Sequence, residues 1–213
     1  MSRHSVAQAI QTIGRPVFTT REIASLRHGS LSATSHDLAR LAKQGRIQRI
    51  TRGLWVESND RRLTRFHLVP YLVGRHQAYV SFLSALNLHG VIEQIPQIVY
   101  AATTEHTRLK KTSIATYSLH RIDPRFFSGF GWYGRGQDFL IATAEKALVD
   151  SLYLSSRKGK PFGFFPELDF ARLSLRQVRR WIQQIPDARI RKYASDGLDR
   201  LRARERKCTQ ASR

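Results

Sequence analysis

The sequence predicts an α+β protein in which an N-terminal winged helix-turn-helix domain precedes a mixed α/β C-terminal domain. Two observations lead to this prediction. Apolar residues recur every three or four positions through the first 45 residues, and then every second position up to about residue 57. Further along, strand-like runs rich in β-branched and aromatic residues alternate with helical patterns. A length of 213 residues suits two domains of this kind.

Two short helices are expected at the start of the chain. Apolar residues recur at helical spacing over residues 2–13, and Gly14 ends this run. The second helix covers residues 21–27 and takes Thr20 as its N-cap, because a threonine hydroxyl can accept a hydrogen bond from a first-turn amide. Residues 17–19 are expected to form a short extended connector between the two helices.

A third helix and a β-hairpin complete the expected N-terminal domain. Ser32 or Ser35 caps the helix, which ends at Gly45. The apolar pattern then has period two over residues 46–56, with a turn at residues 51–53. Three helices followed by a hairpin are the element order of a winged helix-turn-helix, and the short turn between the second and third helices fits this fold.

These patterns set the expected domain boundaries. The winged helix-turn-helix domain spans residues 1–57 and ends before the polar stretch that begins at Ser58. Residues 58–78 form a connecting helix and linker, in which Pro70 is expected to kink or split the helix. Residues 79–213 form an α+β C-terminal domain with a basic helical tail.

The second half of the chain is expected to mix helices with strands. Helical spacing predicts helices over residues 63–73, 79–88, 143–154, 175–185 and 188–206. Strand-like runs occupy residues 98–103, 113–122 and 139–141. Two segments, residues 126–136 and 161–170, are expected to be irregular.

The composition is strongly basic. Thirty-six Lys and Arg against 16 Asp and Glu give a net charge of +20, which draws polyanions such as nucleic acid or an anionic membrane. Residues 1–60 hold nine basic and four acidic residues, residues 61–170 hold 14 and eight, and residues 171–213 hold 13 and four. We therefore expect the tail, as well as the N-terminal domain, to take part in a polyanion contact.

Cysteine usage and hydropathy exclude several classes of protein. The single cysteine, Cys208, rules out an intramolecular disulfide framework and a Cys-rich zinc site, and it fits a reducing compartment such as the cytoplasm. Neither a signal peptide nor an uncharged apolar run of about 18 residues is visible, so secretion and membrane insertion are not expected. Phosphate-binding loops, zinc-protease motifs and nucleophile elbows are also missing, and we expect no cofactor and no metal.

A candidate DNA-binding surface lies on the third helix and the hairpin. Opposite its inward leucines the helix carries Ala33, His36, Arg40 and Lys43, a cationic stripe suited to a major groove, although a merely solvated face would have the same composition. Hydroxyl side chains at its N-terminal turn suit base edges, and the basic hairpin suits the adjacent backbone or minor groove. With the start of the second helix included, the expected DNA-binding residues are Thr20, Arg21, Ser32, Thr34, Ser35, His36, Arg40, Lys43, Arg49, Thr51 and Arg52.

Several short motifs occur together along the chain. They are Phe18-Thr19-Thr20, Arg52-Gly53-Leu54-Trp55-Val56, Tyr79-Val80-Ser81, Ser84-Ala85-Leu86-Asn87-Leu88-His89-Gly90, Gln94-Ile95-Pro96 and Glu145-Lys146-Ala147-Leu148-Val149-Asp150. With these motifs in this order, the sequence resembles the AbiE antitoxin family, and the resemblance covers nearly the whole chain.

The resemblance implies an antitoxin of a type IV toxin-antitoxin system that acts in abortive infection, a form of phage defence. It implies that the winged helix represses the protein's own operon by binding operator DNA. It also implies that the C-terminal domain opposes a nucleotidyltransferase-like toxin, for which direct binding is not required. The family's DNA-contacting positions carry over to Ser32, Thr34, Ser35, His36, Arg40, Lys43, Arg49 and Arg52. The sequence leaves open whether two copies bind DNA cooperatively.

Two other functions compete with this hypothesis. A nonspecific nucleic-acid-binding protein would use the Arg-rich tail with Trp181 and Tyr193, although Trp181 shares the apolar face of its helix. A metal-dependent nuclease would need a compact cluster of carboxylates. The carboxylates available to it, which show no such spacing, are Glu93, Glu105, Asp138, Glu145 and Asp150. We therefore expect the protein not to be an enzyme.

Three polar residues of the C-terminal motifs have structural interpretations. His89 lies in the last turn of a helix, favourably placed against the helix dipole, and Gly90 supplies the C-terminal cap. Lys146 and Asp150 are four residues apart, and we expect them to pair on the surface of their helix.

Overall fold

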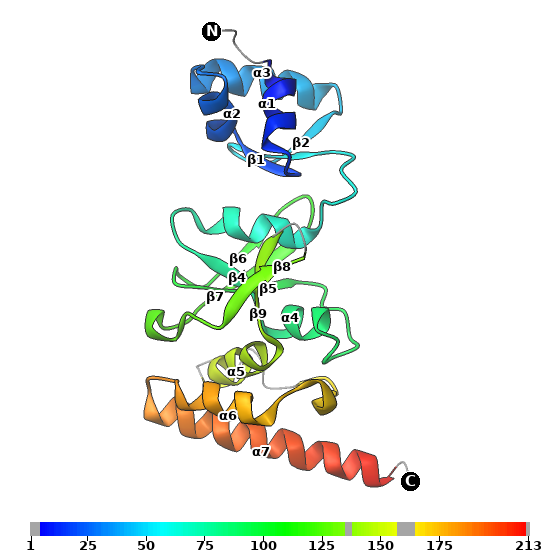
Figure 1. Cartoon of the computed structure of the whole chain (residues 1–213), viewed down its shortest axis with the longest axis vertical. Coiled ribbons are helices and arrows are strands. Elements are labelled where there is room, and N and C mark those ends of the chain that lie inside the picture. Colours follow the sequence, from blue (N-terminus) through cyan, green and yellow to red (C-terminus); the bar gives the residue numbers. More distant parts are fainter. Residues whose placement is uncertain (1–4, 135–137, 157–164, 212–213) are drawn as a thin grey trace. The chain divides into compact units, whose positions relative to one another are not determined.

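The computed structural model describes residues 5–134, 138–156 and 165–211 (Figure 1). The chain divides into two compact units. The N-terminal unit comprises the chain up to Tyr71 together with Lys111–Ala115, and the C-terminal unit comprises Leu72–Lys110 and the chain from Thr116 onward.

The N-terminal unit is a winged helix-turn-helix, as the sequence predicts. Its elements are α1 (Val6–Ile13), β1 (Val17–Thr19), α2 (Thr20–Leu26), α3 (Leu31–Lys43), β2 (Ile47–Thr51) and β3 (Leu54–Glu57). The three strands form an antiparallel sheet in the order β1-β3-β2. Strand β1 corrects the expected connector, because Val17 and Phe18 pair with Val56 and Trp55 of the hairpin. The local sequence shows that this segment is extended but does not show its distant partner.

The helix caps differ by one or more residues from those expected. Thr19, rather than Thr20, caps α2, because its hydroxyl accepts from the Glu22 amide at 3.2 Å while the Glu22 carboxylate accepts from the Thr19 amide at 2.7 Å. This reciprocal pair is a capping box, which requires a Glu or Gln three residues after the cap. Ser30, rather than Ser32 or Ser35, caps α3 by accepting from the Ala33 amide at 3.2 Å.

A small hydrophobic core fixes the positions of the three helices and the wing. Trp55 of β3 is 2 % exposed, and Leu38 of α3 is fully buried. Burial of aromatic and aliphatic side chains supplies most of the stabilisation of a domain of this size. The buried residues of this core are Val6, Ala9, Ile10, Phe18, Ile23, Leu38, Ile47 and Trp55.

The C-terminal unit is built on a mixed six-stranded sheet with the strand order β6-β7-β5-β4-β9-β8. Its strands are β4 (Ala78–Val80), β5 (Val99–Thr103), β6 (Arg108–Lys111), β7 (Thr116–Arg121), β8 (Phe130–Tyr133) and β9 (Phe139–Ala142). Strands β5 and β7 are parallel, as are β4 and β9, whereas β4 and β5 are antiparallel, as are β8 and β9.

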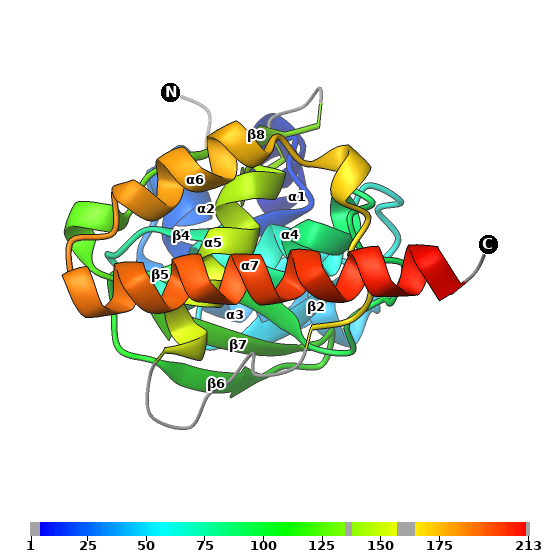
Figure 2. The ribbon, with the colours of Figure 1, turned by 90° about the horizontal axis from the view of Figure 1, so that it is seen from below.

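Helices form the remaining layers of this unit. The α-helices are α4 (Phe82–Leu88), α5 (Ala144–Ser155), α6 (Leu175–Gln183) and α7 (Ala188–Ala211). The unit also contains the 3₁₀ segments η2 (Pro124–Phe126) and η3 (Phe170–Arg172), whereas most of a third, η1 (Arg65–Val73), belongs to the N-terminal unit. Helix α5 packs on α4 and is covered by α6 and α7, which lie side by side in front of it in Figure 2.

Several expectations for the C-terminal half need correction. Tyr79 and Val80 belong to β4 and not to a helix, because they pair with β5 on one side and Val80 pairs with β9 on the other. Residues 126–136, expected to be irregular, contain β8, which is an edge strand beside β9. The helix expected over residues 63–73 is instead a 3₁₀ segment over Arg65–Val73 that contains Pro70, because proline both lacks an amide and clashes with the preceding turn of an α-helix.

The other elements agree more closely with those predicted from the sequence. Helices α5 and α6 lie where the helical spacing predicts them, and their N-caps are Thr143 and Ser174. Strand β7 is shorter than the expected run at residues 113–122, and β6 was not expected. Part of the expected loop at residues 161–170, namely residues 161–164, lies outside the described residues. Within the described part of the chain, the structure contains no helix that is both long enough and apolar enough to span a bilayer.

Candidate nucleic-acid interface

The solvent-facing side of α3 carries most of the expected contact residues. The exposed residues of the helix are Leu31, Ser32, Ala33, Ser35, His36, Ala39, Arg40 and Lys43. Leu38 on the opposite side is buried in the core, and Leu41 and Ala42 pack against that core. The helix therefore presents hydroxyls at its N-terminal end and cations towards its C-terminal end, all from one rigid element.

An ion-pair network holds the cationic part of α3. Asp37 accepts from Arg27 of the preceding turn at 2.9 Å and lies 3.4 Å from the Arg40 guanidinium. The Arg40 side chain is 73 % exposed, so its second contact is a weak surface pair. Because Arg27 already neutralises Asp37, the charge of Arg40 is available for a phosphate or a guanine edge.

Two of the expected contact residues are buried. Thr34 is fully buried on the inner side of α3, four residues before Leu38. A side chain in that position cannot reach a base edge, and we leave it out of the interface.

Thr20 is buried because it joins α2 to the wing. Its amide donates to the Gly53 carbonyl at 3.0 Å, and its hydroxyl accepts from the Trp55 indole Nε1 at 2.8 Å. These contacts give Thr20 a positioning role rather than a DNA contact. Arg21, the next residue, is exposed.

The wing is a tight hairpin with two exposed arginines. Gly53 has a φ of +76°, a left-handed conformation that lets β2 turn directly into β3. Arg52 is exposed at this turn, and the Arg49 guanidinium lies 5.7 Å from the centre of the Trp55 ring, where it also contacts the Thr51 carbonyl at 3.4 Å. Thr51 itself is half-buried.

Two further residues of this surface are not among those predicted from the sequence. Arg46 is exposed in the link between α3 and β2, and its position before a strand of period two could have identified it. Leu31, the first residue of α3, is 52 % exposed. An apolar side chain at the start of a recognition helix is suited to the methyl group of thymine.

The surface has a large cationic excess. Arg21, Arg40, Lys43, Arg46, Arg49 and Arg52 are all exposed. The acidic residues of the same segment are Glu22, Asp37 and Glu57, and all three are half-buried. Glu22 pairs with Arg15, and Asp37 pairs with Arg27 and only weakly with Arg40, so these carboxylates leave most of the exposed positive charge of α3 and the wing in place.

The carboxylates that a nuclease would use are engaged separately. Glu105 pairs with Arg108, and Glu145 accepts from the Ser174 amide at 3.0 Å. Among the residues that the structure describes, no three His, Cys, Asp or Glu side chains form a group that could hold a metal ion. The described carboxylates therefore do not assemble the metal site on which the nuclease hypothesis depends.

Lys146 and Asp150 form the expected pair, but inside the C-terminal unit and not on the surface. Both side chains are completely buried, and the Lys146 ammonium donates to one Asp150 oxygen. The other oxygen accepts from the Ser81 hydroxyl at 2.7 Å and from the Tyr79 hydroxyl at 3.0 Å. Helix α5, which carries both residues, is covered by α4, α6 and α7. The four-residue spacing of the pair does not reveal this cover. Since solvent cannot reach these groups, they support the fold rather than a reaction.

His89 has the structural role that the sequence indicates. It caps α4, and its Nε2 atom lies 2.8 Å from the Ala142 carbonyl at the end of β9. Gly90 follows with a φ of +70°, the conformation expected of a glycine after a helix.

The candidate interface coincides with the match to a known family. Residues 11–57, which include α2, α3 and the wing, match the family model described as "Transcriptional regulator, AbiEi antitoxin". This match confirms, for the N-terminal module, the resemblance to AbiE-type antitoxins, and it covers less than a quarter of the chain. A search of curated proteins finds no match.

Proposed function

We propose that the protein is the DNA-binding antitoxin of a type IV toxin-antitoxin system and represses its own operon. The observation that carries this proposal is the exposed cationic surface of α3 and the wing, which lies within the segment that matches AbiEi transcriptional regulators. A winged helix alone assigns no function, but this charge distribution favours DNA over a protein partner.

The arrangement suggests how the module reads DNA. With α3 in a major groove, Ser32, Ser35 and His36 are placed for base edges, while Arg40 and Lys43 reach a phosphate or guanine. The wing arginines, Arg49 and Arg52, then lie on the adjacent backbone or in the minor groove. Phosphate contacts supply most of the affinity, and the N-terminal part of α3 supplies the sequence preference.

The remaining parts of the proposal concern the toxin and the compartment. We propose that the C-terminal unit counteracts a nucleotidyltransferase-like toxin, without a need for direct binding, during abortive infection by phage. The cytoplasm is the proposed location. The family match and the single cysteine support these statements.

The proposal is tested by binding to DNA from upstream of the protein's own gene. The purified chain is titrated against this fragment and a scrambled fragment of the same length and composition over a series of salt concentrations. We expect a preference for the native fragment that persists at physiological salt, because base contacts are less sensitive to salt than phosphate contacts. Equal, steeply salt-dependent binding to both fragments would instead indicate a nonspecific nucleic-acid-binding protein.

A pair of matched variants tests the assignment of α3. The variant Arg40→Ala with Lys43→Ala is expected to lose binding to the native fragment while the fold is retained, because both side chains are exposed. The control, Arg75→Ala with Arg121→Ala, removes the same charge from exposed positions of the C-terminal unit. Undiminished operator binding by the folded α3 variant would exclude this helix as the reader.

A further inference from the structure

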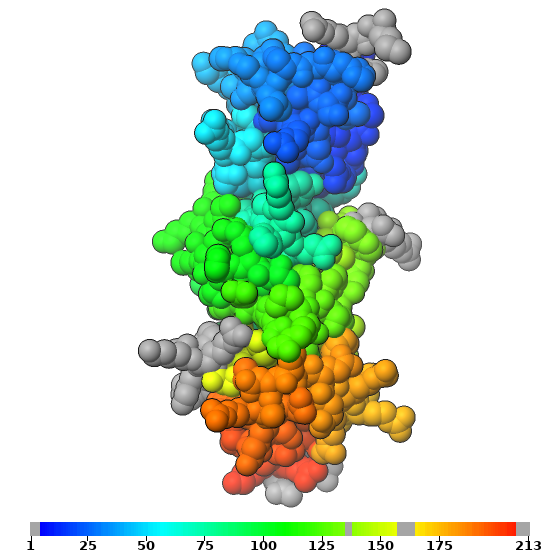
Figure 3. All heavy atoms as spheres, turned by 90° about the vertical axis from the view of Figure 1, so that its left-hand side faces the viewer, coloured from blue at the N-terminus to red at the C-terminus, as the bar shows by residue number. Residues whose placement is uncertain are grey.

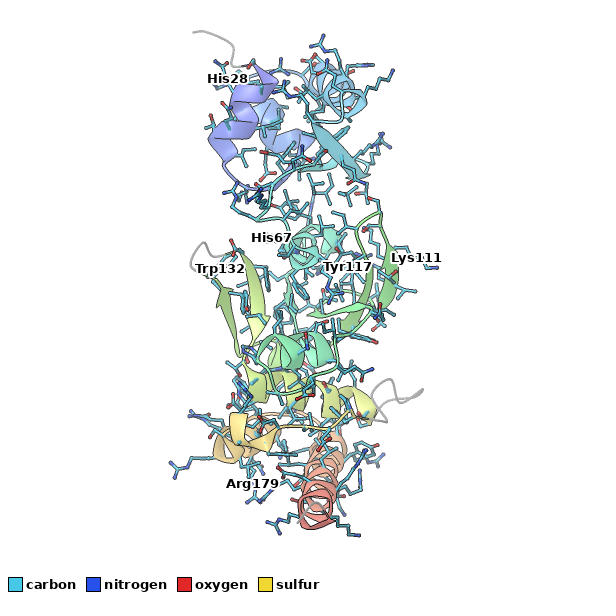
Figure 4. The ribbon with its side chains drawn as sticks, turned by 90° about the vertical axis from the view of Figure 1, so that its right-hand side faces the viewer. His28, His67, Lys111, Tyr117, Trp132 and Arg179 are labelled. Atoms are coloured by element: carbon cyan, nitrogen blue, oxygen red, sulfur yellow. The ribbon has the colours of Figure 1, made fainter. Side chains whose placement is uncertain are left out.

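We propose that the α4–β5 loop, residues 89–98, is the surface through which two copies of this chain associate. The loop lies wholly within the C-terminal unit. Helix α4 and this loop lie on the right-hand side of that unit in Figure 1, which is turned away from the viewer in Figure 3 and faces the viewer in Figure 4. The inference concerns the free protein and does not depend on the DNA binding proposed above.

The segment around this loop is the longest part of the chain without a cation. Lys and Arg make up 36 of the 213 residues, yet residues 76–107 contain neither. The acidic residues of this segment are Glu93 and Glu105, and Glu105 pairs with Arg108. Two copies of a protein with a net charge of +20 repel each other where their cations meet. A contact between copies is therefore favoured where cations are missing.

A groove of about 350 Å³ runs along the loop. Its lining is apolar or polar without any charged residue, and consists of Leu83, Ile92, Gln94, Ile95, Pro96, Gln97, Ile98 and Tyr100. Ile95 is 64 % exposed, more than any other large apolar side chain in the described part of the chain. Exposed apolar surface beside a groove is typical of a site that another protein covers.

Hydrogen bonds hold the loop in shape from both ends. The Asn87 side-chain amide donates to the Ile92 and Glu93 carbonyls at 3.3 and 3.4 Å. At the other end, the Ser84 hydroxyl accepts from the Tyr100 amide at 2.9 Å. A surface that is ordered before association loses little conformational entropy on binding. The exposed apolar side chain is thus presented in a fixed position.

The groove and the exposed Ile95 occupy the same loop, as a two-fold contact requires. In such a contact, both copies use the same patch of surface. Ile95 of each copy then fills the groove of the other. Gln94 and Gln97 are exposed beside it and supply a polar rim without charge, which suits the usual arrangement of an apolar centre with a polar edge.

A second copy suits this surface better than an acidic partner does. Charge steers an acidic protein towards exposed arginines, and the groove has none. A second copy is repelled by those same arginines and approaches most easily at a neutral surface. The lack of charge along the loop therefore selects for a partner that is itself strongly basic.

The test measures self-association of the full chain by sedimentation equilibrium, over about 1 to 200 μM protein. Nucleic acid is removed beforehand with a nuclease, so that a polyanion does not bridge the copies. We expect a dimer with a dissociation constant in the micromolar range, as is typical of a small contact. The constant should fall between about 0.15 and 0.5 M salt, because salt screens the repulsion between the copies and leaves an apolar contact in place.

Matched variants locate the contact. Ile95→Ala should raise the dissociation constant by about 100-fold, because loss of the burial of this side chain costs about tenfold in each of the two copies. Ile95→Arg should remain monomeric, since it places two like charges at the centre of the contact. The control, Leu109→Arg, makes the same change at a side chain of β6 that is 58 % exposed, and it should associate like the parent. All variants are checked for folding by circular dichroism.

Four results would overturn the proposal. They are a monomeric parent at every concentration, association that weakens as salt rises, an unchanged dissociation constant in the folded Ile95→Arg variant, and an equal loss in the Leu109→Arg control. Weakening with salt would assign the association to ion pairs on another surface. Operator preference is measured separately on DNA fragments, so this proposal and the proposed function can fail independently.

Discussion

Replacement of Lys146 by methionine is expected to destabilise the C-terminal unit by about 3 to 5 kcal/mol, the typical effect of removing one partner of a buried ion pair. Lys146 and Asp150 have no exposed surface. In the variant, the Tyr79 and Ser81 hydroxyls are the hydrogen-bond donors that Asp150 keeps among the described residues. Methionine fills a similar volume, so the loss arises from the uncompensated carboxylate and not from a cavity.

The surroundings of Lys146 support a value in this range. Its ammonium also donates to the Tyr79 hydroxyl at 3.2 Å and lies 3.8 Å from the centre of the Phe126 ring. Burial lowers the pKa of Lys146, and the charge of Asp150 opposes that shift. Burial also raises the pKa of Tyr79 well above its usual value, with Asp150 adding to the effect, so the phenol stays a donor. A folded domain is stable by only about 5 to 15 kcal/mol, and this loss is therefore readily measured.

The assay is hydrogen exchange of α5 amides in urea, which reports opening of the C-terminal unit separately from the winged helix. Urea is preferred to guanidinium because it does not screen charges. The double variant Lys146→Met, Asp150→Leu serves as the comparison. It should be less destabilised than the sum of its single variants by at least 1 kcal/mol, because it buries no lone charge. A cost below about 1 kcal/mol for Lys146→Met, or strict additivity in the double variant, would refute the reasoning.

Three further predictions follow from single residues. Burial lowers the pKa of His120 from 6.5 to about 4. The stability that neutral His120 gives above pH 6.5 should therefore be lost as the pH falls towards 4, by up to about 3 kcal/mol. The urea midpoint should depend more steeply on pH in the parent than in His120→Gln, and parallel slopes would contradict this prediction. Gly129→Ala should lower the melting temperature by several degrees, since the residue has a φ of +77° and the new Cβ would lie 2.5 Å from Trp181. The control variant Gly131→Ala should have a smaller effect, because a Cβ atom at Gly131 has no neighbouring atom within 4 Å. Thr20→Val should cost about 1 to 3 kcal/mol by leaving the Trp55 indole without its acceptor, and an unchanged denaturation midpoint would argue against a positioning role.

The N-terminal unit was largely predictable because its signals are local. Helix spacing, the glycine after α3 and the period-two hairpin all lie within a few residues of the elements they define. Thr34 shows where this reasoning failed. It stands four residues before Leu38 and seven before Leu41, so its periodicity places it inside. Its hydroxyl suggested a base contact, but helical position determines exposure more strongly than side-chain chemistry does.

The C-terminal unit was less predictable because its sheet depends on distant partners. Val80 pairs with Ala101 of β5 and with Ile141 of β9, which lies about 60 residues away along the chain. A run of two β-forming residues followed by a helix gives no local indication of such neighbours. For the same reason, the four-residue spacing of Lys146 and Asp150 predicts their contact but not their burial, which depends on the helices that cover α5.

The distribution of acidic residues explains why a net charge of +20 points to a ligand. Many of the carboxylates have structural roles. Asp150 is buried with Lys146, Asp123 and Asp169 cap η2 and η3, and backbone amides at the start of α7 lower the pKa of Asp187. Carboxylates engaged in this way cannot balance exposed arginines elsewhere. The excess is therefore exposed on α3 and the wing, where Glu22 and Asp37 are half-buried and pair with Arg15 and Arg27. A cationic face of this kind is expected of a protein that binds a polyanion such as DNA.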